Sequence, residues 1–379
     1  MSDEADERTR SEELTGPRAN DAPDPPEVGG VQVPCRACGA MLEYTPGTSE
    51  LNCPHCGGTT RIEAPPLPVD EQDYTAALAR LADEGETMSV RTMTCRSCGA
   101  TTELMPEVAA DHCPYCGSHY NVTAETARVI KPNAILPFSI ARTRVDEFLM
   151  TWIRSRWFAP NALKRDAEKE RVVNGMYLPH WTYDSATTTS YQGWRGDYYY
   201  VTVGSGKNRV QQRRTRWSPR QGVVSRRFDD VLVPASTSPL TGLASQLGGW
   251  DLSRVVPYDN RYVAGFLSEV YRVDLPTGFE TAKGIMAATI EGDIRISIGG
   301  DTQRIDARRT AHNEVMFKHL LLPLWVGAFR YRGKVYRFVI NGRTGGVVGE
   351  RPWSWIKITL TALAAAAAGF TIAFIASQR

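Results

Sequence analysis

All eight cysteines of this 379-residue chain fall into two copies of one pattern. In each copy, 14 residues separate one C-x-x-C pair from a second, giving the sets Cys35, Cys38, Cys53, Cys56 and Cys95, Cys98, Cys113, Cys116. Four thiolates suit a tetrahedral zinc ion, and one tight turn brings the two cysteines of a pair to the same ion. A glycine follows the second cysteine of every pair, where the backbone must turn back towards the metal. The pattern predicts two zinc ribbons, each holding one structural zinc ion.

Two other interpretations of the cysteines stay open. Iron also accepts four thiolates, whereas a redox dithiol needs one C-x-x-C pair rather than two at matched spacing. Four sulfurs fill a tetrahedral site and leave no position for catalysis, so we expect structural sites. No apolar stretch follows Met1, so we expect no secretory signal peptide. Paired cysteines in such a chain favour metal thiolates in a reducing compartment over disulfides.

Composition divides the rest of the chain. Residues 1–30 hold nine acidic side chains and three arginines with almost no large apolar residue, which predicts a disordered tail. We expect a multidomain protein made of an acidic tail (1–30), a first zinc ribbon (31–63), a linker with a short helix (64–90), a second zinc ribbon (91–124), an α+β domain (130–350) and a transmembrane helix (353–376).

The α+β domain is predicted from local patterns. Apolar residues recur at helical spacing over residues 142–160, up to and including Trp157. Residues 178–203 alternate like a strand, and turn signals at Arg332-Gly333 and Asn341-Gly342 indicate a hairpin or meander. With helical stretches near 238–247 and 278–290, the domain should contain an antiparallel sheet.

The C-terminal segment is predicted to cross a membrane. Residues 358–376 contain no charge, Pro, Asn or Gln, and a helix of this length approaches the roughly 30 Å of a bilayer core. A soluble core helix rich in alanine is the alternative. The residues expected to anchor the span are the interfacial Trp353, Trp355 and Lys357 and the apolar Ile358, Phe370 and Ile375.

Flanking charges predict the orientation of this span. Arg343, Arg351 and Lys357 precede it, whereas Arg379 alone follows it. The positive-inside rule therefore places the bulk of the chain in the cytoplasm, as a single-pass protein.

A basic segment lies inside the central domain. Residues 195–227 hold nine basic residues and one acid, Asp197, interleaved with Tyr and Trp. The candidate basic surface consists of Arg209, Arg213, Arg214, Arg216, Arg220, Arg226 and Arg227. Anionic lipid, an acidic protein and nucleic acid are the possible ligands, against a solvated hairpin face without a ligand.

No catalytic motif is convincing in this chain. Val203–Asn208 has a partial likeness to a phosphate loop, but Val201 stands where a glycine is required and no Ser or Thr follows Lys207. His180, Asp229, Asp230, His312 and His319 are possible pocket residues that more often have structural roles.

Several segments together resemble a bacterial family of zinc-ribbon proteins with a C-terminal hydrophobic helix. They are KPNAILPF at Lys131, MYLPHWTYDSAT at Met176, RFDDVLVPAS at Arg227, PYDNRYVAGFLSEVY at Pro257, FKHLLLPLW at Phe317 and NGRTGGVVGERPWS at Asn341. The resemblance covers about residues 90–376, so the first ribbon and the tail look like additions. Members are often labelled primosomal protein N-prime (replication factor Y), superfamily II helicase or TFIIB-type zinc ribbon protein.

The resemblance implies association with PspA-type membrane-stress proteins and SPFH-domain (virion-core-like) proteins at the bacterial inner membrane. Helicase activity is not expected, because the chain has no Walker A motif. The leading hypothesis is a non-enzymatic, membrane-anchored adaptor or scaffold with two structural zinc ions. The alternatives are a nucleic-acid-binding protein of the replication or transcription type and an enzyme that uses His180, Asp229 or Asp230.

Overall fold

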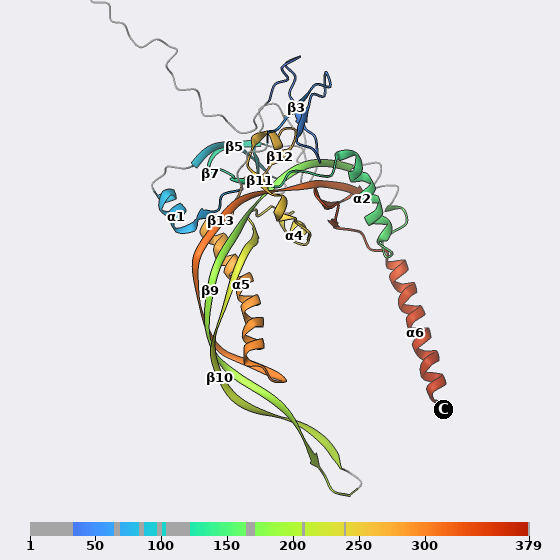
Figure 1. Ribbon diagram of the computed structural model, residues 1–379. Coiled ribbons are helices and arrows are strands. Elements are labelled where there is room, and N and C mark those ends of the chain that lie inside the picture. Colours follow the sequence, from blue (N-terminus) through green and yellow to red (C-terminus); the bar gives the residue numbers. More distant parts are fainter. Residues whose placement is uncertain are drawn as a thin grey trace, which may run out of the picture.

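The computed structural model describes residues 33–63, 69–82, 87–96, 101–103, 122–163, 171–206, 209–238 and 240–377. Figure 1 shows a body from which a long curved arm and the C-terminal helix project towards the same side. The predicted acidic tail, residues 1–30, lies outside the described residues.

Two small antiparallel sheets are formed by the N-terminal third of the chain. The first has the order β1-β2-β3, from β1 (Glu43–Tyr44), β2 (Glu50–Asn52) and β3 (Thr59–Arg61). The second has the order β6-β5-β7, from β5 (Thr87–Cys95), β6 (Thr101–Glu103) and β7 (Val122–Ile130). Between them lie β4 (Gln72–Asp73) and α1 (Tyr74–Ala82), so the short helix predicted in the linker is present.

One large curved sheet forms the central domain. Its main path runs β10-β9-β13-β14-β15 and is antiparallel throughout, which confirms the predicted α+β domain with an antiparallel sheet. The strands are β9 (Arg171–Val203), β10 (Val210–Pro234), β13 (Thr302–Tyr331), β14 (Lys334–Asn341) and β15 (Val347–Gly349). The short strands β4, β8 (Ala134–Ile135), β11 (Val256–Pro257) and β12 (Leu267–Ser268) attach beside this path.

The length of three strands gives the molecule its shape. β9, β10 and β13 have 33, 25 and 30 residues, whereas strands usually have about 3–10. β9 and β10 pair along their length and leave the body as the arm (Figure 1).

Helices cover parts of this sheet. They are α2 (Arg142–Ser155), α4 (Thr241–Ala244) and α5 (Leu275–Ile298), with 3-10 turns at Leu252–Arg254 and Asn260–Tyr262. The Asp274 side chain caps α5 by accepting the Thr277 N–H at 2.8 Å. A Cβ atom at Gly278 would lie 2.4 Å from the Tyr183 hydroxyl, so only glycine allows α5 to approach β9 this closely.

The two predicted turns behave differently. Arg332 and Gly333 both have positive φ, 49° and 78°, and close the two-residue hairpin between β13 and β14 as expected. Asn341-Gly342 begins a longer turn that joins the antiparallel strands β14 and β15, so the predicted meander is present. The Asn341 side chain accepts the N–H groups of Arg343 and Thr344, and the chain turns back at Gly345.

The first small sheet shares its hydrophobic core with the central domain. Leu42, Tyr44 and Leu51 are buried in the same cluster as Phe138 and Phe266. The Tyr44 N–H donates to Ala264 O at 3.0 Å, and the Tyr44 and Tyr262 rings pack edge to face at 5.2 Å. The first ribbon region is therefore continuous with the body rather than an independent added module.

Candidate metal centre, membrane helix and acidic pocket

Four cysteines meet at the end of the first small sheet. The Sγ atoms of Cys35 and Cys56 are 3.6 Å apart, as are those of Cys38 and Cys53, and all four lie within 4.8 Å of one another. Sulfurs bound at about 2.3 Å to a tetrahedral zinc ion lie roughly 3.8 Å apart. The first predicted set can therefore hold a metal ion in the described geometry.

Two tight turns bring these sulfurs together. The N–H groups of Gly39 and Gly57 donate to the carbonyl oxygens of Cys35 and Cys53, at 2.8 and 2.9 Å. Both glycines have positive φ, 76° and 73°, which is the conformation that the sequence analysis required.

Backbone groups also favour the thiolate form that a metal binds. The N–H groups of Ala37 and Cys38 lower the pKa of the Cys35 thiol. The Cys56 N–H, which also faces the cluster, lowers the pKa of the Cys53 thiol to about 6. Neighbouring thiols raise the pKa of Cys38 to about 12 and also raise that of Cys56. The turns therefore favour the thiolate at Cys35 and Cys53 alone, and a bound cation would be needed to ionise all four.

The second predicted set is described only at its first member. Cys95 ends β5 and is buried. Cys98, Cys113 and Cys116 lie outside the described residues. A second metal ion therefore stays a prediction.

The C-terminal segment forms one continuous helix, α6 (Trp355–Ser377). It is long and apolar enough to cross a membrane, with a mean hydropathy of 2.0 over its most apolar 18-residue window, and none of that window is buried. A soluble core helix would be covered by other elements, whereas α6 projects from the body (Figure 1). The predicted anchor residues Ile358, Phe370 and Ile375 all lie on this helix.

A group of residues that we call the collar holds the start of α6 against the body. It comprises Trp157, Phe158, Trp353, Trp355 and Lys357. Lys357 Nζ donates to the carbonyl oxygens of Trp157 and Ala159 and to Asn161 Oδ1, at 3.0, 2.9 and 2.8 Å. The Ser354 N–H donates to Phe158 O at 2.7 Å.

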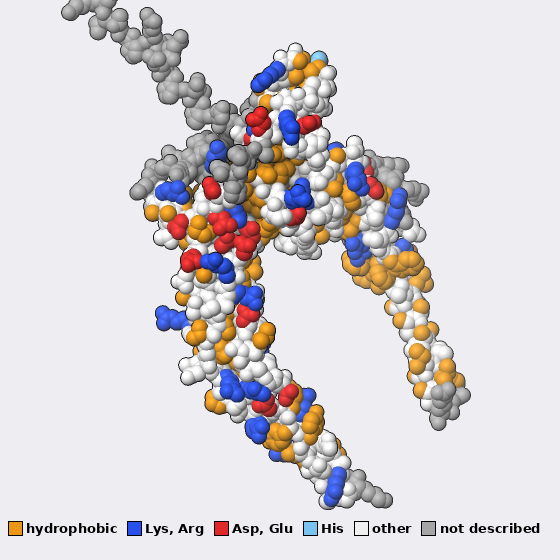
Figure 2. Space-filling view, in the orientation of Figure 1, with side chains coloured by type: hydrophobic (Ala, Val, Ile, Leu, Met, Phe, Trp, Pro, Cys, Tyr) orange, Lys and Arg blue, Asp and Glu red, His pale blue; other side chains and the backbone are white. Residues whose placement is uncertain are grey.

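Sequence analysis missed the place of Trp157. We expected it on the apolar face of one helix, but α2 ends at Ser155 and the Trp157 side chain is 72% exposed. It lies beside Lys357, 200 residues later in the chain, and Trp353 and Trp355 are exposed on the same part of the surface. Figure 2 shows hydrophobic side chains gathered where α6 leaves the body. Both the end of α2 and the exposure of Trp157 are properties of the fold, so the sequence carried no signal for this position.

Replacing Lys357 by methionine should loosen α6 from the body without making α6 less apolar. Three hydrogen bonds from a charged donor are lost, and a hydrogen bond to a charged group has a net worth of about 1.5–3 kcal/mol. We expect trypsin to cleave after Arg156 several times faster in Lys357→Met than in the wild type. Mass spectrometry of the fragments over time measures the rate. Lys283→Met, which removes a lysine of α5 on the arm (Figure 1), is the matched control. Equal cleavage rates in the two variants would show that the Lys357 hydrogen bonds do not hold α6 against the body.

The seven arginines of the candidate basic surface fall into two groups. Arg226 forms a two-fold ion pair with Asp293 at 2.6 and 2.7 Å, and Arg227 binds Glu314 at 2.5 Å. The other five lie further out along the arm: Arg209, Arg213, Arg214, Arg216 and Arg220. The predicted surface is therefore neutralised at its base and remains basic towards its end.

An acidic cluster that sequence analysis did not find lies at the base of the arm. Carboxylate oxygens of Glu71, Asp184 and Asp229 lie within 4.8 Å of one another beside a cavity of about 500 Å³. Lys318 Nζ binds Glu71 at 2.9 Å and Asp230 at 2.7 Å. β-bulges help to bring these groups together: the bulge in β10 lies opposite Asp184, and the bulge in β13 lies opposite the next residue, Ser185.

Burial raises the pKa of Asp184 to about 7, and its hydrogen bond to Glu71 adds to the effect. In the unfolded chain this carboxyl ionises near pH 4. As the pH rises from about 4 to about 7, the unfolded state loses its proton first, so this group progressively lowers the stability of the fold.

Asp184→Asn should therefore flatten the pH dependence of stability. We expect the unfolding midpoint of the variant minus that of the wild type to be larger at pH 8 than at pH 5. The reason is that the amide introduced in the variant never ionises but can still accept the Asp230 N–H. Unfolding midpoints in detergent at the two pH values measure this. A difference between the two proteins that does not change with pH would contradict it.

The candidate catalytic residues do not converge. His180 pairs with Pro234 and Leu320, four strand positions from Asp184 and hence roughly 13 Å away. Burial lowers the pKa of His180 and of His319 to about 4, which keeps both neutral. Asp229 belongs to the acidic cluster beside the 500 Å³ cavity, whereas His180 is not among the residues that line this cavity.

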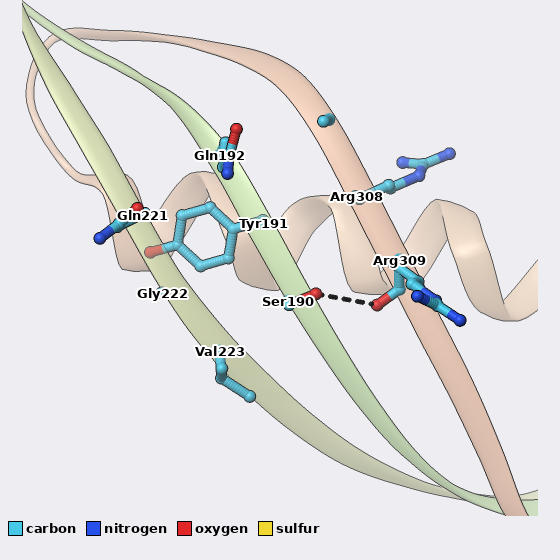
Figure 3. Close-up of a pocket in the computed structure, with 9 residues that line it drawn as sticks. Ser190, Tyr191, Gln192, Gln221, Gly222, Val223, Arg308 and Arg309 are labelled. Carbon is cyan, nitrogen blue, oxygen red and sulfur yellow. Dashed lines mark hydrogen bonds between the residues drawn. The ribbon is translucent and has the colours of Figure 1, made fainter.

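A second cavity, of about 590 Å³, lies on the arm (Figure 3). Its lining includes Tyr191, Gln192, Gly222 and Arg309 but no carboxylate, cysteine or histidine. The Tyr191 hydroxyl is hydrogen-bonded to Ser297 of α5 at 2.8 Å. The polar side chains that line this cavity carry hydroxyl, amide and guanidinium groups.

Comparisons with known proteins give one relative and no function. No protein-family profile matches the chain, and no solved structure matches it. The chain is similar to the uncharacterized protein YdjG of Bacillus subtilis (strain 168), at 23% identity over 238 residues, which is 60% of this chain. The match spans 66% of the length of YdjG, just under two thirds.

Proposed function

We propose that the protein is a non-enzymatic adaptor that α6 anchors in a membrane and that presents zinc-stabilised surfaces to protein partners. The exposure of α6 carries this proposal: a 23-residue apolar helix with no buried face in its most apolar window needs a non-aqueous environment. The collar supports it, since tryptophans around a lysine are typical of the membrane–water interface.

Zinc is the metal that the first cysteine cluster favours. Four sulfurs at tetrahedral spacing match structural zinc sites and leave no open position for a substrate or water. The metal would be held by Cys35, Cys38, Cys53 and Cys56, and its role would be to fix the end of the ribbon. A closed site of this kind suits an adaptor better than an enzyme.

The location and partners follow from charge and from the family resemblance. Basic residues before α6 favour the cytoplasmic face of a bacterial inner membrane for the body of the protein. PspA-type and SPFH-domain proteins are the partners that the resemblance suggests, and both classes can be tested by affinity purification from detergent.

Membrane fractionation tests the proposal directly. The full chain should stay in the pellet after high-salt and alkaline washes, whereas a chain that ends at Glu350 should be released. Zinc in the purified full chain is measured by mass spectrometry. Release of the full chain by the alkaline wash would refute the anchor.

A further inference from the structure

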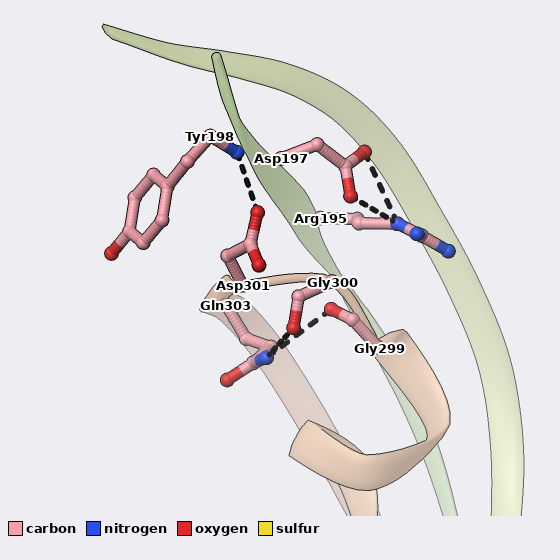
Figure 4. Close-up of polar contacts among 7 residues, drawn as sticks. All are labelled: Arg195, Asp197, Tyr198, Gly299, Gly300, Asp301 and Gln303. Atoms are coloured by element: carbon pink, nitrogen blue, oxygen red, sulfur yellow. Dashed lines mark hydrogen bonds and ion pairs between the residues drawn. The ribbon is translucent and has the colours of Figure 1, made fainter. Parts of the chain in front are cut away.

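The outer part of the arm is a two-stranded ribbon. β13 pairs with β9 only as far as Thr302 opposite Gly196. At this junction the Asp301 carboxylate accepts the Tyr198 N–H at 2.6 Å, and the Asp301 N–H donates to Gly196 O at 2.9 Å (Figure 4). Beyond it, residues 197–203 and 210–216 pair only with each other in the described part of the chain. We call these residues the arm ribbon.

Positive charge on the arm ribbon is not neutralised. Arg213, Arg214 and Arg216 have no acidic partner among the residues that the structure describes, and neither has Arg209 just before the ribbon. The acid of the ribbon, Asp197, is already paired with Arg195 at 2.9 Å. Arg214 and Arg216 lie two positions apart on one face, so their side chains project roughly 7 Å from each other. That spacing suits two neighbouring phosphate groups.

Aromatic side chains are exposed among these arginines. Tyr199 is 44% exposed and Tyr200 is 64% exposed, and Trp217, opposite Gly196 where the ribbon begins, is 44% exposed. Arg213 stacks over the Tyr198 ring at 4.3 Å. Figure 2 shows apolar and basic side chains side by side along the arm. Tyr and Trp beside Arg are suited to contact with a membrane–water interface, which is apolar towards the bilayer core and charged at the headgroups.

We propose that the arm ribbon binds anionic phospholipid headgroups on the membrane that α6 anchors, an inference that rests on the proposed function. The arm and α6 leave the body towards the same side, and the arm extends past the end of α6 (Figure 1), so the ribbon meets the headgroups of that bilayer when α6 tilts away from the direction of the arm. Arginine attracted to an anionic leaflet and aromatic rings at the headgroup level both favour lipid over a free solvated surface.

The ribbon must lie along the headgroups rather than follow α6 into the bilayer. Guanidinium groups are strongly disfavoured in hydrocarbon, and the ribbon carries several of them. Beyond Gly196 it has neither β13 nor α5 behind it, so it is the part of the arm that can bend to the surface.

Quenching of Trp217 by brominated lipid tests this with the full chain. The protein is reconstituted in vesicles of phosphatidylcholine alone or mixed with phosphatidylglycerol, and the Trp217 signal is the difference between the wild type and Trp217→Phe. We expect quenching of Trp217 in the anionic vesicles that high salt reverses, and little in the neutral ones. Equal quenching in both lipids, or none in either, would overturn the proposal.

Variants separate the ribbon from general charge effects. Arg213→Gln/Arg214→Gln/Arg216→Gln should weaken the ribbon–vesicle equilibrium on the order of 100-fold, about fivefold for each arginine. The control Arg61→Gln/Arg254→Gln/Arg330→Gln removes the same charge from exposed positions on the body and should have no effect.

Flotation distinguishes the failure of the anchor from the failure of the ribbon. Flotation with neutral vesicles supports α6 as the anchor, whatever Trp217 reports. Flotation only with anionic vesicles, reversed by salt, would support the ribbon and refute the anchor, and flotation with neither would refute both. Release of Trp217 from anionic vesicles by duplex DNA at equal phosphate concentration would assign the ribbon to nucleic acid and overturn the lipid assignment.

Discussion

Replacing Cys53 by serine is expected to remove one metal ion per chain and to destabilise the whole body, not only the first ribbon. Cys53 is 1% exposed and is one of four sulfurs within 4.8 Å. Structural zinc contributes about 10–16 kcal/mol of apparent binding free energy in zinc-finger peptides at neutral pH. Loss of one ligand of four forfeits a large part of that energy, because the remaining sulfurs no longer fill the tetrahedron.

The effect should spread because the ribbon has no separate core. Leu42, Tyr44 and Leu51 pack with Phe138 and Phe266 of the central domain, so unfolding the ribbon would expose both sides of that contact. We expect an unfolding midpoint lowered by many degrees and rapid proteolysis within residues 33–63. A chelator that removes the metal from the wild type should have the same result.

His55→Ala is the matched control for this experiment. His55 lies between Cys53 and Cys56 but is exposed and is not a member of the cluster of close sulfurs. Its substitution should leave both the metal content and the unfolding midpoint unchanged. A Cys53→Ser protein with wild-type metal content would show that the four thiolates are not a metal site.

The cysteine cluster could be predicted because its chemistry is local. Cys35 and Cys38 lie in one turn, and spacing with a glycine at positive φ is enough to specify that turn. The apolar run of α6 is local in the same sense. Each is a property of one short segment, and the structure places both segments as the sequence analysis expected.

The features that sequence analysis missed depend on pairing between distant segments. Trp157 and Lys357 meet only because the loop after α2 lies beside the start of α6. Asp184 meets Glu71 and Lys318 through the register of β9, β13 and β4, and β-bulges shift that register. Hydrophobic alternation indicates that a strand exists, but it does not indicate which residue lies opposite which.

The basic segment is a case in which contacts between distant segments removed part of a predicted feature. Composition treated seven arginines as one surface, whereas Arg226 and Arg227 find Asp293 and Glu314 on other elements. In the folded arm, the arginines nearest the body are therefore neutralised by ion pairs, whereas those further out keep their positive charge unpaired. Only the outer part of the arm keeps the excess of positive charge from which a basic surface was predicted for the whole segment.

An arginine at the centre of α6 should prevent stable insertion, whereas the same substitution at its end should not. Ala367 is the midpoint of the uncharged stretch from Ile358 to Ala376. At the centre of a membrane helix, arginine costs about 2.5–3.5 kcal/mol. The seven strongly apolar residues of the stretch contribute roughly 2–4 kcal/mol in total, at about 0.3–0.6 kcal/mol each, so one arginine cancels most of the driving force.

Ala367→Arg should therefore shift the equilibrium between the inserted and non-inserted helix by roughly 100-fold. Alkaline extraction of membranes measures the protein that remains integrated. Ser377→Arg is the matched control, because residue 377 ends α6 and its side chain can reach the headgroups. If both variants resist extraction equally, α6 does not lie across the hydrocarbon core. If both are extracted while the wild type stays, the cost does not depend on depth, and contact with a protein surface rather than with lipid would hold α6 in place.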